Sequence, residues 1–280
     1  MKSSIASLIT ALALVAALAA VGGSSASADG GGPTTILVGG KGVTSPDGEV
    51  RYVTLATGRR TIVSVVRVRG GQVVRWRLLR GYFGVPVIAL DGDTEGVSRD
   101  GRTLVLAETP SDSSTGISTR FAVIDTRSLR LRRISLDGNY SYDALSPDAS
   151  TLFLVEYLAT GPDARYRVRS YDLVAGRLIP RAVVEKGAEL VMQGQAVTRA
   201  TSSDGRWAYT LYARRKREPF VHALDTVSRQ SICIDLPLGL GPARQMQLRL
   251  KLGPDGTLAV RKDRRTVAVV DTRTFAVRRS

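Results

Sequence analysis

Side chains suited to catalysis are scarce in this sequence. The 280 residues contain one histidine, His222, and one cysteine, Cys233. A serine–histidine–aspartate triad, a histidine metal site or a thiolate–imidazolium pair therefore has almost no raw material here. His222 precedes Ala223-Leu224-Asp225 in an apolar segment, so we expect it to be a structural side chain rather than a base. We predict no intrinsic catalysis and no cofactor.

The single cysteine also rules out a disulfide within the chain. Cys233 lies between Ile232 and Ile234, and this apolar setting predicts a small buried residue. A reactive thiol or a bridge between two molecules is the alternative.

One acidic segment has the spacing of the first half of a calcium-binding loop. Asp91, Asp93 and Glu95 place oxygen ligands at alternate positions before Gly96. A complete loop of this kind needs a bidentate Glu at its twelfth position, where this chain has Arg102. The segment is thus either a weak metal site or an acidic turn between structural units.

A cluster of four cations is a candidate binding site for anions. It lies where we expect the tip of a hairpin and contains Arg214, Arg215, Lys216 and Arg217. Such a tip produces a positive field, and Arg can bind phosphate or carboxylate through two hydrogen bonds. A solvated hairpin tip without a ligand is the alternative.

Two tyrosines form the third candidate. Tyr140 and Tyr142 lie in the segment Asn139–Tyr142, which we expect to be a loop between two units. Their rings could stack on a sugar or another planar ligand, or they could pack between the units.

These candidates must be positioned by a repeated turn. Five turns share Ser, Pro, Asp and Gly chemistry, and their central aspartates are 48 to 56 residues apart: Asp47, Asp100, Asp148, Asp204 and Asp255. Pro presets φ, Ser and Asp side chains bond to the local backbone, and Gly favours the last position. A period near 50 residues with strand-like content is typical of a β-propeller or a similar array.

Strand-like segments recur in each period. An apolar strand follows each turn, a third strand ends in most units at an Asp-Thr or Asp-Leu turn, and a fourth strand alternates Arg with apolar residues, as in Leu129–Ile134. We therefore predict an all-β fold, a propeller of about five four-stranded antiparallel blades. A sixth, degenerate blade around Gly176–Val197 is the alternative count, and the two ends of the chain are long enough to meet and close a ring.

The local sequences resemble the YVTN-type and TolB-type β-propeller repeats of exported bacterial proteins. The best matches are Arg51-Tyr52-Val53-Thr54 and Ala268-Val269-Val270-Asp271-Thr272, together with Ser-Pro-Asp-Gly before an apolar strand. The resemblance covers nearly the whole chain after residue 28 and implies the propeller fold. It includes binding modules, dehydrogenase-like subunits and lactonase-like enzymes, but no functional residue of these could be matched here.

The N-terminal segment predicts export. Residues 1–28 have the pattern of a secretory signal peptide, with the apolar run Ile5–Val21 followed by Ala26-Ser27-Ala28. An uncleaved membrane anchor is the alternative, although the run is short for a span of about 20 residues. We expect residues 29–280 to form one propeller domain that is secreted or associated with the cell envelope.

The net charge of +15 predicts attraction to anionic surfaces. Export argues against nucleic acid as the natural partner, and we expect membrane contact to be peripheral at most. We predict a binding or scaffolding module that engages a protein or an anionic partner through the irregular loop face, opposite the Asp-Gly turns. A broad cationic face would favour binding, buried acids converging at the central channel would favour a lactonase-like or dehydrogenase-like enzyme, and an exposed apolar patch would favour a part of a larger assembly.

Overall fold

The computed structural model describes residues 36–280, apart from residues 110, 114–115, 161–163 and 184–190. The predicted signal peptide, residues 1–28, lies outside the described residues. The described chain is almost entirely β-strand, with one short helix, α1 (Pro242–Gln245). Within these residues no helix has the length and apolar character needed to span a membrane.

The strands form five antiparallel sheets, which confirms the predicted all-β propeller fold with about five four-stranded blades. Blade 1 contains β2 (Val43–Thr44), β3 (Val50–Thr57), β4 (Arg60–Arg67) and β5 (Val73–Arg80). Blade 2 contains β6 (Phe83–Pro86), β7 (Thr103–Glu108), β9 (Gly116–Asp125) and β10 (Leu131–Asp137), with β8 (Ser111–Ser113) beside β9 and β1 (Ile36–Leu37) beside β6.

The remaining three blades follow in chain order. Blade 3 contains β11 (Tyr140–Leu145), β12 (Thr151–Ala159), β13 (Arg165–Asp172) and β14 (Arg177–Val183), with β15 (Met192–Gln193) beside β13. Blade 4 contains β16 (Gln195–Thr201), β17 (Trp207–Ala213), β18 (Phe220–Asp225) and β19 (Gln230–Asp235). Blade 5 contains β20 (Leu248–Leu252), β21 (Thr257–Lys262), β22 (Arg265–Asp271) and β23 (Val277–Arg279).

The repeated turns form as their chemistry predicts. In blade 2 the Ser98 hydroxyl donates to Asp100 Oδ1 at 2.6 Å and accepts from the Thr103 amide at 2.9 Å. The turns that begin at Ser45, Ser146 and Ser202 make the same two bonds. These turns join the first and second strands, and the side chain of each Ser therefore fixes where the second strand begins.

The Asp-Thr turns lie beside the Asp-Gly turns of the same blade. Thr126 Oγ1 donates to the Gly101 carbonyl at 2.6 Å, and Thr272 Oγ1 donates to the Gly256 carbonyl at 2.6 Å. Thr226 Oγ1 does the same to Gly205 at 3.0 Å. Both kinds of turn thus occupy one face of the molecule, and the connections between blades lie on the other.

Apolar side chains pack between successive blades. One cluster joins blades 1 and 2 through Val63, Val65, Leu104 and Leu106, all almost fully buried. Another joins blades 4 and 5 through residues such as Leu211 and Leu258. The core is therefore divided into interfaces between neighbouring blades, as expected where each blade buries its faces against the next.

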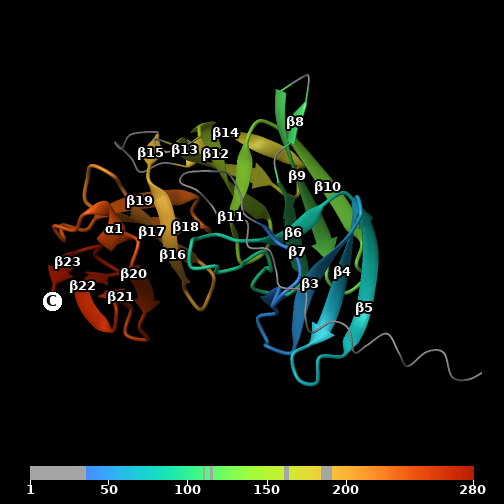
Figure 1. Ribbon diagram of the computed structural model, residues 1–280, viewed down its shortest axis with the longest axis horizontal. Helices are drawn as coiled ribbons and strands as arrows, with labels where there is room; N and C mark the ends of the chain where they lie inside the picture. Colours follow the sequence, from blue (N-terminus) through green and yellow to red (C-terminus); the bar gives the residue numbers. More distant parts are fainter. Residues whose placement is uncertain (1–35, 110, 114–115, 161–163, 184–190) are drawn as a thin grey trace, which may run out of the picture.

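The five blades lie along an open arc, with blade 1 and blade 5 at its two ends (Figure 1). Across the described strands, no sheet pairing joins blade 5 to blade 1. The strand β1, which could have closed a ring, instead pairs with β6 through Ile36–Pro86 and Leu37–Val85. The segment considered for a sixth blade supplies β14, β15 and the start of β16, so its described part belongs to blades 3 and 4.

Two local predictions are wrong. Cys233 is exposed on β19 rather than buried. Ile232 and Ile234 both pack against the core of blades 4 and 5, so the alternation of the strand turns the residue between them the other way. The segment predicted as a loop at Asn139–Tyr142 instead begins β11, the inner strand of blade 3, because its tyrosines are buried between blades.

Candidate functional site

A long connection in blade 2 reaches across the centre of the arc. This crossing loop, residues 87–97, follows β6 and precedes β7, and Val87 and Thr94 are bridged at its base. The amides of Leu90 and Asp91 donate to the carbonyls of Ala196 and Val197 at 3.1 and 3.2 Å. Figure 1 shows this teal loop extending to β16, the inner strand of blade 4. Blades 2 and 4 are therefore joined directly across the axis.

A buried group of charges lies beneath the crossing loop. The guanidinium of Arg199, on β16, forms ion pairs with Asp143 of blade 3 and with Glu95 of the crossing loop, the latter at 3.4 Å. Its Nε donates to Thr210 Oγ1 at 2.9 Å, and Thr201 Oγ1 donates to Glu95 at 2.8 Å. We call Arg199, Asp143 and Glu95 the charged junction. It ties three blades together around one cation.

Burial and charge act in opposite directions within the charged junction. Burial alone would lower the pKa of Arg199, but the carboxylates of Asp143 and Glu95 outweigh it and raise the pKa above its usual value. Burial raises the pKa of Glu95, and Arg199 opposes that rise. One arginine thus forms ion pairs with both acids and offsets one of their two negative charges.

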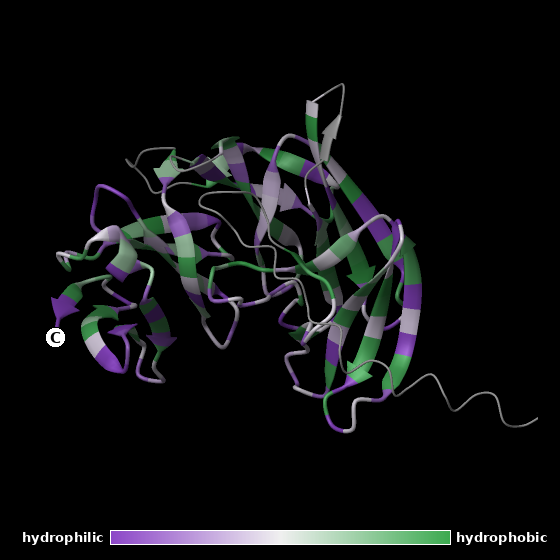
Figure 2. Cartoon of the chain, viewed as in Figure 1, coloured by the Kyte–Doolittle hydropathy of each residue, from purple (hydrophilic) through white to green (hydrophobic). Residues whose placement is uncertain are grey.

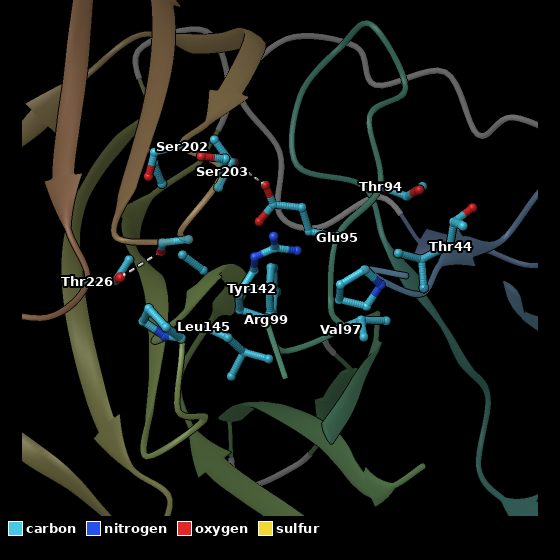
Figure 3. A pocket seen from close by; sticks show the side chains of 17 residues that line it. Thr44, Thr94, Glu95, Val97, Arg99, Tyr142, Leu145, Ser202, Ser203 and Thr226 are labelled. Carbon is cyan, nitrogen blue, oxygen red and sulfur yellow. Dashed lines mark hydrogen bonds between the residues drawn. The ribbon is translucent and has the colours of Figure 1, made fainter. Parts of the chain in front are cut away.

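A cavity of about 390 Å³ opens beside the charged junction, on the face of the Asp-Gly turns. Four blades contribute to its lining, through Pro46 of blade 1, Arg99 of blade 2, Leu145 of blade 3 and Ser202 of blade 4. Figure 3 shows hydroxyl groups of serines and threonines around the rim. The lining therefore combines apolar walls with several hydroxyls, as small-ligand and peptide sites do.

Arg99 is the charged side chain that reaches into the middle of this cavity (Figure 3). It belongs to the repeated turn Ser98-Arg99-Asp100-Gly101, at the position where three other turns carry proline. Its guanidinium makes no ion pair or hydrogen bond with the described part of the chain, whereas Arg199 nearby is fully engaged. An arginine with open donors inside a lined cavity is suited to binding a carboxylate or phosphate group.

The three residues predicted as a metal site all lie in the crossing loop, but their side chains have different partners. The Asp91 amide pairs with blade 4, and the Asp91 carboxylate accepts from the Asp93 amide at 3.3 Å. Glu95 belongs to the charged junction. Among the described residues, no group of three or more His, Cys, Asp or Glu side chains converges on a metal position. The loop lies within blade 2 rather than between blades.

The cation cluster does lie at a hairpin tip, between β17 and β18. Arg215, Lys216 and Arg217 are exposed there. Arg214 is half-buried, and it forms an ion pair with Asp235 at 2.5 Å while its guanidinium lies 4.8 Å from the centre of the Phe220 ring. One of the four predicted ligands therefore supports the hairpin, and three remain accessible.

The two candidate tyrosines are each about 4% exposed. Tyr140 and Tyr142 pack in the core between blades 2 and 3, and Tyr142 also forms part of the cavity lining. Burial raises the pKa of Tyr142 well above its usual value, so its hydroxyl stays protonated. Tyr142 is thus one of the sequence-predicted residues that the structure places beside Arg99, together with Glu95.

His222 is buried inside blade 4, and burial lowers its pKa to about 4. It lies on β18, paired across the sheet with Thr210 and Cys233, and does not line the cavity. The sequence prediction of a structural histidine agrees with this setting. Arg99 and Arg199, in contrast, were not singled out from the sequence, because the chain is rich in arginine and their partners are distant in sequence.

Comparison with known proteins gives the fold alone. No protein-family model matches the sequence, and no curated protein does. Among solved structures, TolB from Acinetobacter baumannii is 14% identical with a TM-score of 0.47, and the alignment covers 85% of this chain and 52% of that one. The chain thus spans about half of that TolB.

Other β-propellers give similar values. The β-propeller domain of the Trilobed protease from Pyrococcus furiosus is 13% identical with a TM-score of 0.48, over 87% of this chain and 71% of that one. A putative TolB from Agrobacterium tumefaciens is 13% identical with a TM-score of 0.41, over 85% and 78%. The chain is a β-propeller similar to TolB-type and other propeller proteins.

Proposed function

We propose that this protein is an exported β-propeller binding module without catalysis of its own, and that it engages a protein partner at the Asp-Gly-turn face. The observation that carries this proposal is the open guanidinium of Arg99 in a cavity lined by four blades. The partner would present a carboxylate, from an acidic side chain or a chain terminus, to Arg99.

The lining of the cavity supports a peptide segment as the bound group. Pro46 and Pro147 contribute apolar surface to the lining, and the side chains of Ser203 and Thr44 contribute hydroxyls. Backbone amides and carbonyls of an extended segment can pair with such hydroxyls, while the carboxylate receives the two parallel donors of Arg99. The sequence pointed to the opposite, irregular loop face, so this proposal moves the partner site to the face of the regular turns.

The arrangement of acids supports binding over catalysis. Buried acids converging at the channel would favour an enzyme, and two acids, Glu95 and Asp143, do converge there. Both form ion pairs with Arg199, which gives them a structural role at the junction of three blades. Export remains part of the proposal, supported by the signal-peptide pattern of residues 1–28.

The proposal can be tested by retention of peptides. A library of random octapeptides is passed over the immobilised protein, and the retained peptides are identified by mass spectrometry. We expect enrichment of peptides with Asp, Glu or a free C-terminal carboxylate. We expect Arg99→Ser to weaken binding of the enriched peptides by about tenfold or more, because a hydrogen-bonded charge contributes roughly 1.5–3 kcal/mol.

Arg102→Ser is the matched control. Arg102 lies in the same turn, its side chain is 63% exposed, and it does not line the cavity. Its replacement removes the same charge and should leave peptide retention unchanged. Equal retention by the wild-type protein and Arg99→Ser would contradict the proposed site.

A further inference from the structure

On one side of its sheet, blade 5 packs against no other described strand, and this face carries several basic residues. Its other face packs against blade 4, where Leu258 and Val260 are fully buried, and Arg279 donates to the Leu238 carbonyl of the connection after β19. Side chains alternate across a strand, so the residues between those that face blade 4 must point away from it. The uncovered face therefore has a composition that can be deduced from the register.

The register places four cations on that face. Lys251 pairs with Ala259, Ala259 with Val269, and Val269 with Arg278, so these residues form one row across all four strands. In the next row Arg249 pairs with Arg261. We call Arg249, Lys251, Arg261 and Arg278 the basic face.

The cations of the basic face are not paired with acids among the described residues, although Asp271, which pairs with Thr257, lies on the same side of the sheet. Within the described chain, no carboxylate forms an ion pair with any of its four cations. Arg249 donates to the backbone carbonyls of Met246 and Leu248, and Arg261 donates to that of Arg264. Asp93 of the crossing loop is the acid that Arg249 influences: burial raises the pKa of Asp93, and Arg249 is one of the cations that oppose the rise. Most of the positive charge is therefore left for a partner.

We infer that the basic face docks the protein on a membrane surface rich in anionic phospholipid. The four cations are spread in two dimensions: about 7 Å separates neighbours on the same side of one strand, and about 14 Å separates the first strand from the fourth. A planar layer of phosphate groups can meet all four at once, whereas a single extended polymer would follow one row.

The surroundings of the basic face fit contact with a plane. The two uncharged residues in the row, Ala259 and Val269, are small, so no large side chain stands between the cations and a flat partner. Blade 5 is at one end of the arc, with no neighbouring blade drawn beyond it (Figure 1). In Figure 2 the strands of blade 5 carry both green and purple segments, and β20 alternates Leu with Arg and Lys. Without an aromatic residue to insert, the docking is electrostatic and peripheral.

The expected size of the effect follows from the number of charges. Each basic residue close to an anionic membrane strengthens the partition by roughly fivefold. Loss of all four should weaken binding by at least about 100-fold, and binding should decrease steeply as ionic strength rises, because screening shortens the range of these charges.

The test is co-sedimentation with vesicles of phosphatidylglycerol and phosphatidylcholine, compared with vesicles of phosphatidylcholine alone. We expect the protein to bind the anionic vesicles, and the variant with Arg249, Lys251, Arg261 and Arg278 changed to Ser to lose that binding. Far-UV circular dichroism confirms that the variant folds. The matched control changes Arg59, Arg69, Arg130 and Arg181, which are exposed on blades 1 to 3, to Ser and removes the same net charge; it should bind within about twofold of the wild type.

Each result decides the inference. Equal loss in the control would mean that the total charge of the protein is responsible and would overturn the assignment to blade 5. Tighter binding to soluble linear polyphosphate than to the vesicles, at equal phosphate concentration, would overturn the choice of a membrane. Arg99→Ser should leave vesicle binding intact, so failure of this inference and failure of the proposed peptide site are separate outcomes.

Discussion

The two ends of the arc present sheet faces of opposite chemistry. The uncovered face of blade 5 carries four cations, whereas the uncovered face of blade 1 is largely apolar. On blade 1, Arg75 and Arg77 donate to carbonyls of blade 2 and so fix which side is covered. Trp76, between them, points the other way and is 64% exposed.

The apolar face of blade 1 extends over three strands. Trp76 pairs with Ser64 and Leu78 with Ile62, so their side chains lie on the same side of the sheet as that of Leu55. Leu78 is 40% exposed. An apolar surface of this kind is typical of a contact with another protein.

The contrast disfavours closure of the arc by contact between blades 1 and 5. Closure by packing blade 5 against blade 1 would bury the basic face against Trp76 and Leu78. Removing unpaired charges from water costs several kcal/mol for each ion, and an apolar face offers no compensating hydrogen bonds. The two faces therefore do not complement each other, and each is suited to a different partner.

The largest effect on stability is expected from a change in the charged junction, which joins blades 2, 3 and 4 between the two ends of the arc. We expect Arg199→Met to lower the free energy of unfolding by about 3–5 kcal/mol, because Asp143 would keep a buried charge without a partner. Urea denaturation measures this change. Lys262→Met is the control, since its partner Asp263 is 77% exposed and the pair should contribute less than about 1 kcal/mol. A similar small loss for Arg199→Met would show that the charged junction does not hold the arc.

A smaller difference in the free energy of unfolding is expected between variants on the two faces of blade 5. Leu258 is fully buried against blade 4, and Leu258→Ala should lower the free energy of unfolding by about 2–5 kcal/mol. Val269, on the opposite face, is partly exposed, and Val269→Ala should cost less than about 1 kcal/mol. Thermal unfolding of both variants gives the comparison. Equal costs would mean that the second face is also covered, which would break the contrast between the two ends.

The smallest effect on stability is expected on blade 1. Trp76→Thr should change the free energy of unfolding by no more than about 0.5 kcal/mol, because the ring is largely exposed and Thr is well tolerated in strands. The same change should reduce binding of the dye anilinonaphthalene sulfonate. Trp207, which stacks on Tyr209 and contacts Phe275, is the matched tryptophan, and Trp207→Thr should cost at least about 1 kcal/mol. A comparable loss at Trp76 would show that its face is covered.

The blades could be predicted from the sequence because their signals are local. Each Ser-x-Asp turn fixes the start of a strand within five residues, and the Asp-Thr turns mark the end of the third strand in most blades. The alternation of apolar and polar residues along a strand then predicts which side of the strand is buried. The count of five blades and the positions of their strands follow from these short-range rules.

The candidate site could not be predicted, because its parts come from distant segments. Arg199 reaches Glu95 over 104 residues and Asp143 over 56. From the sequence, Asp91, Asp93 and Glu95 looked like the start of a metal loop, since nothing local indicates that the segment crosses to blade 4. Arg99 stood among many arginines, and its place in the cavity, without an ion pair to the described residues, became visible only in three dimensions. Cys233 shows a similar limit within one strand. Its apolar neighbours Ile232 and Ile234 face the core, whereas Cys233 lies on the other, exposed side.

The crossing loop has a consequence for how the chain folds. Its bonds to Ala196, Val197 and Thr201 join residues about 100 positions apart, so this part of blade 2 reaches its final form only once β16 exists. Repeat arrays can fold by adding one unit to the next, with each unit contacting only its neighbours. Here a non-neighbour contact links blades 2 and 4. We therefore expect blades 2 to 4 to fold as one cooperative unit, and more slowly than an array whose contacts are all between neighbours.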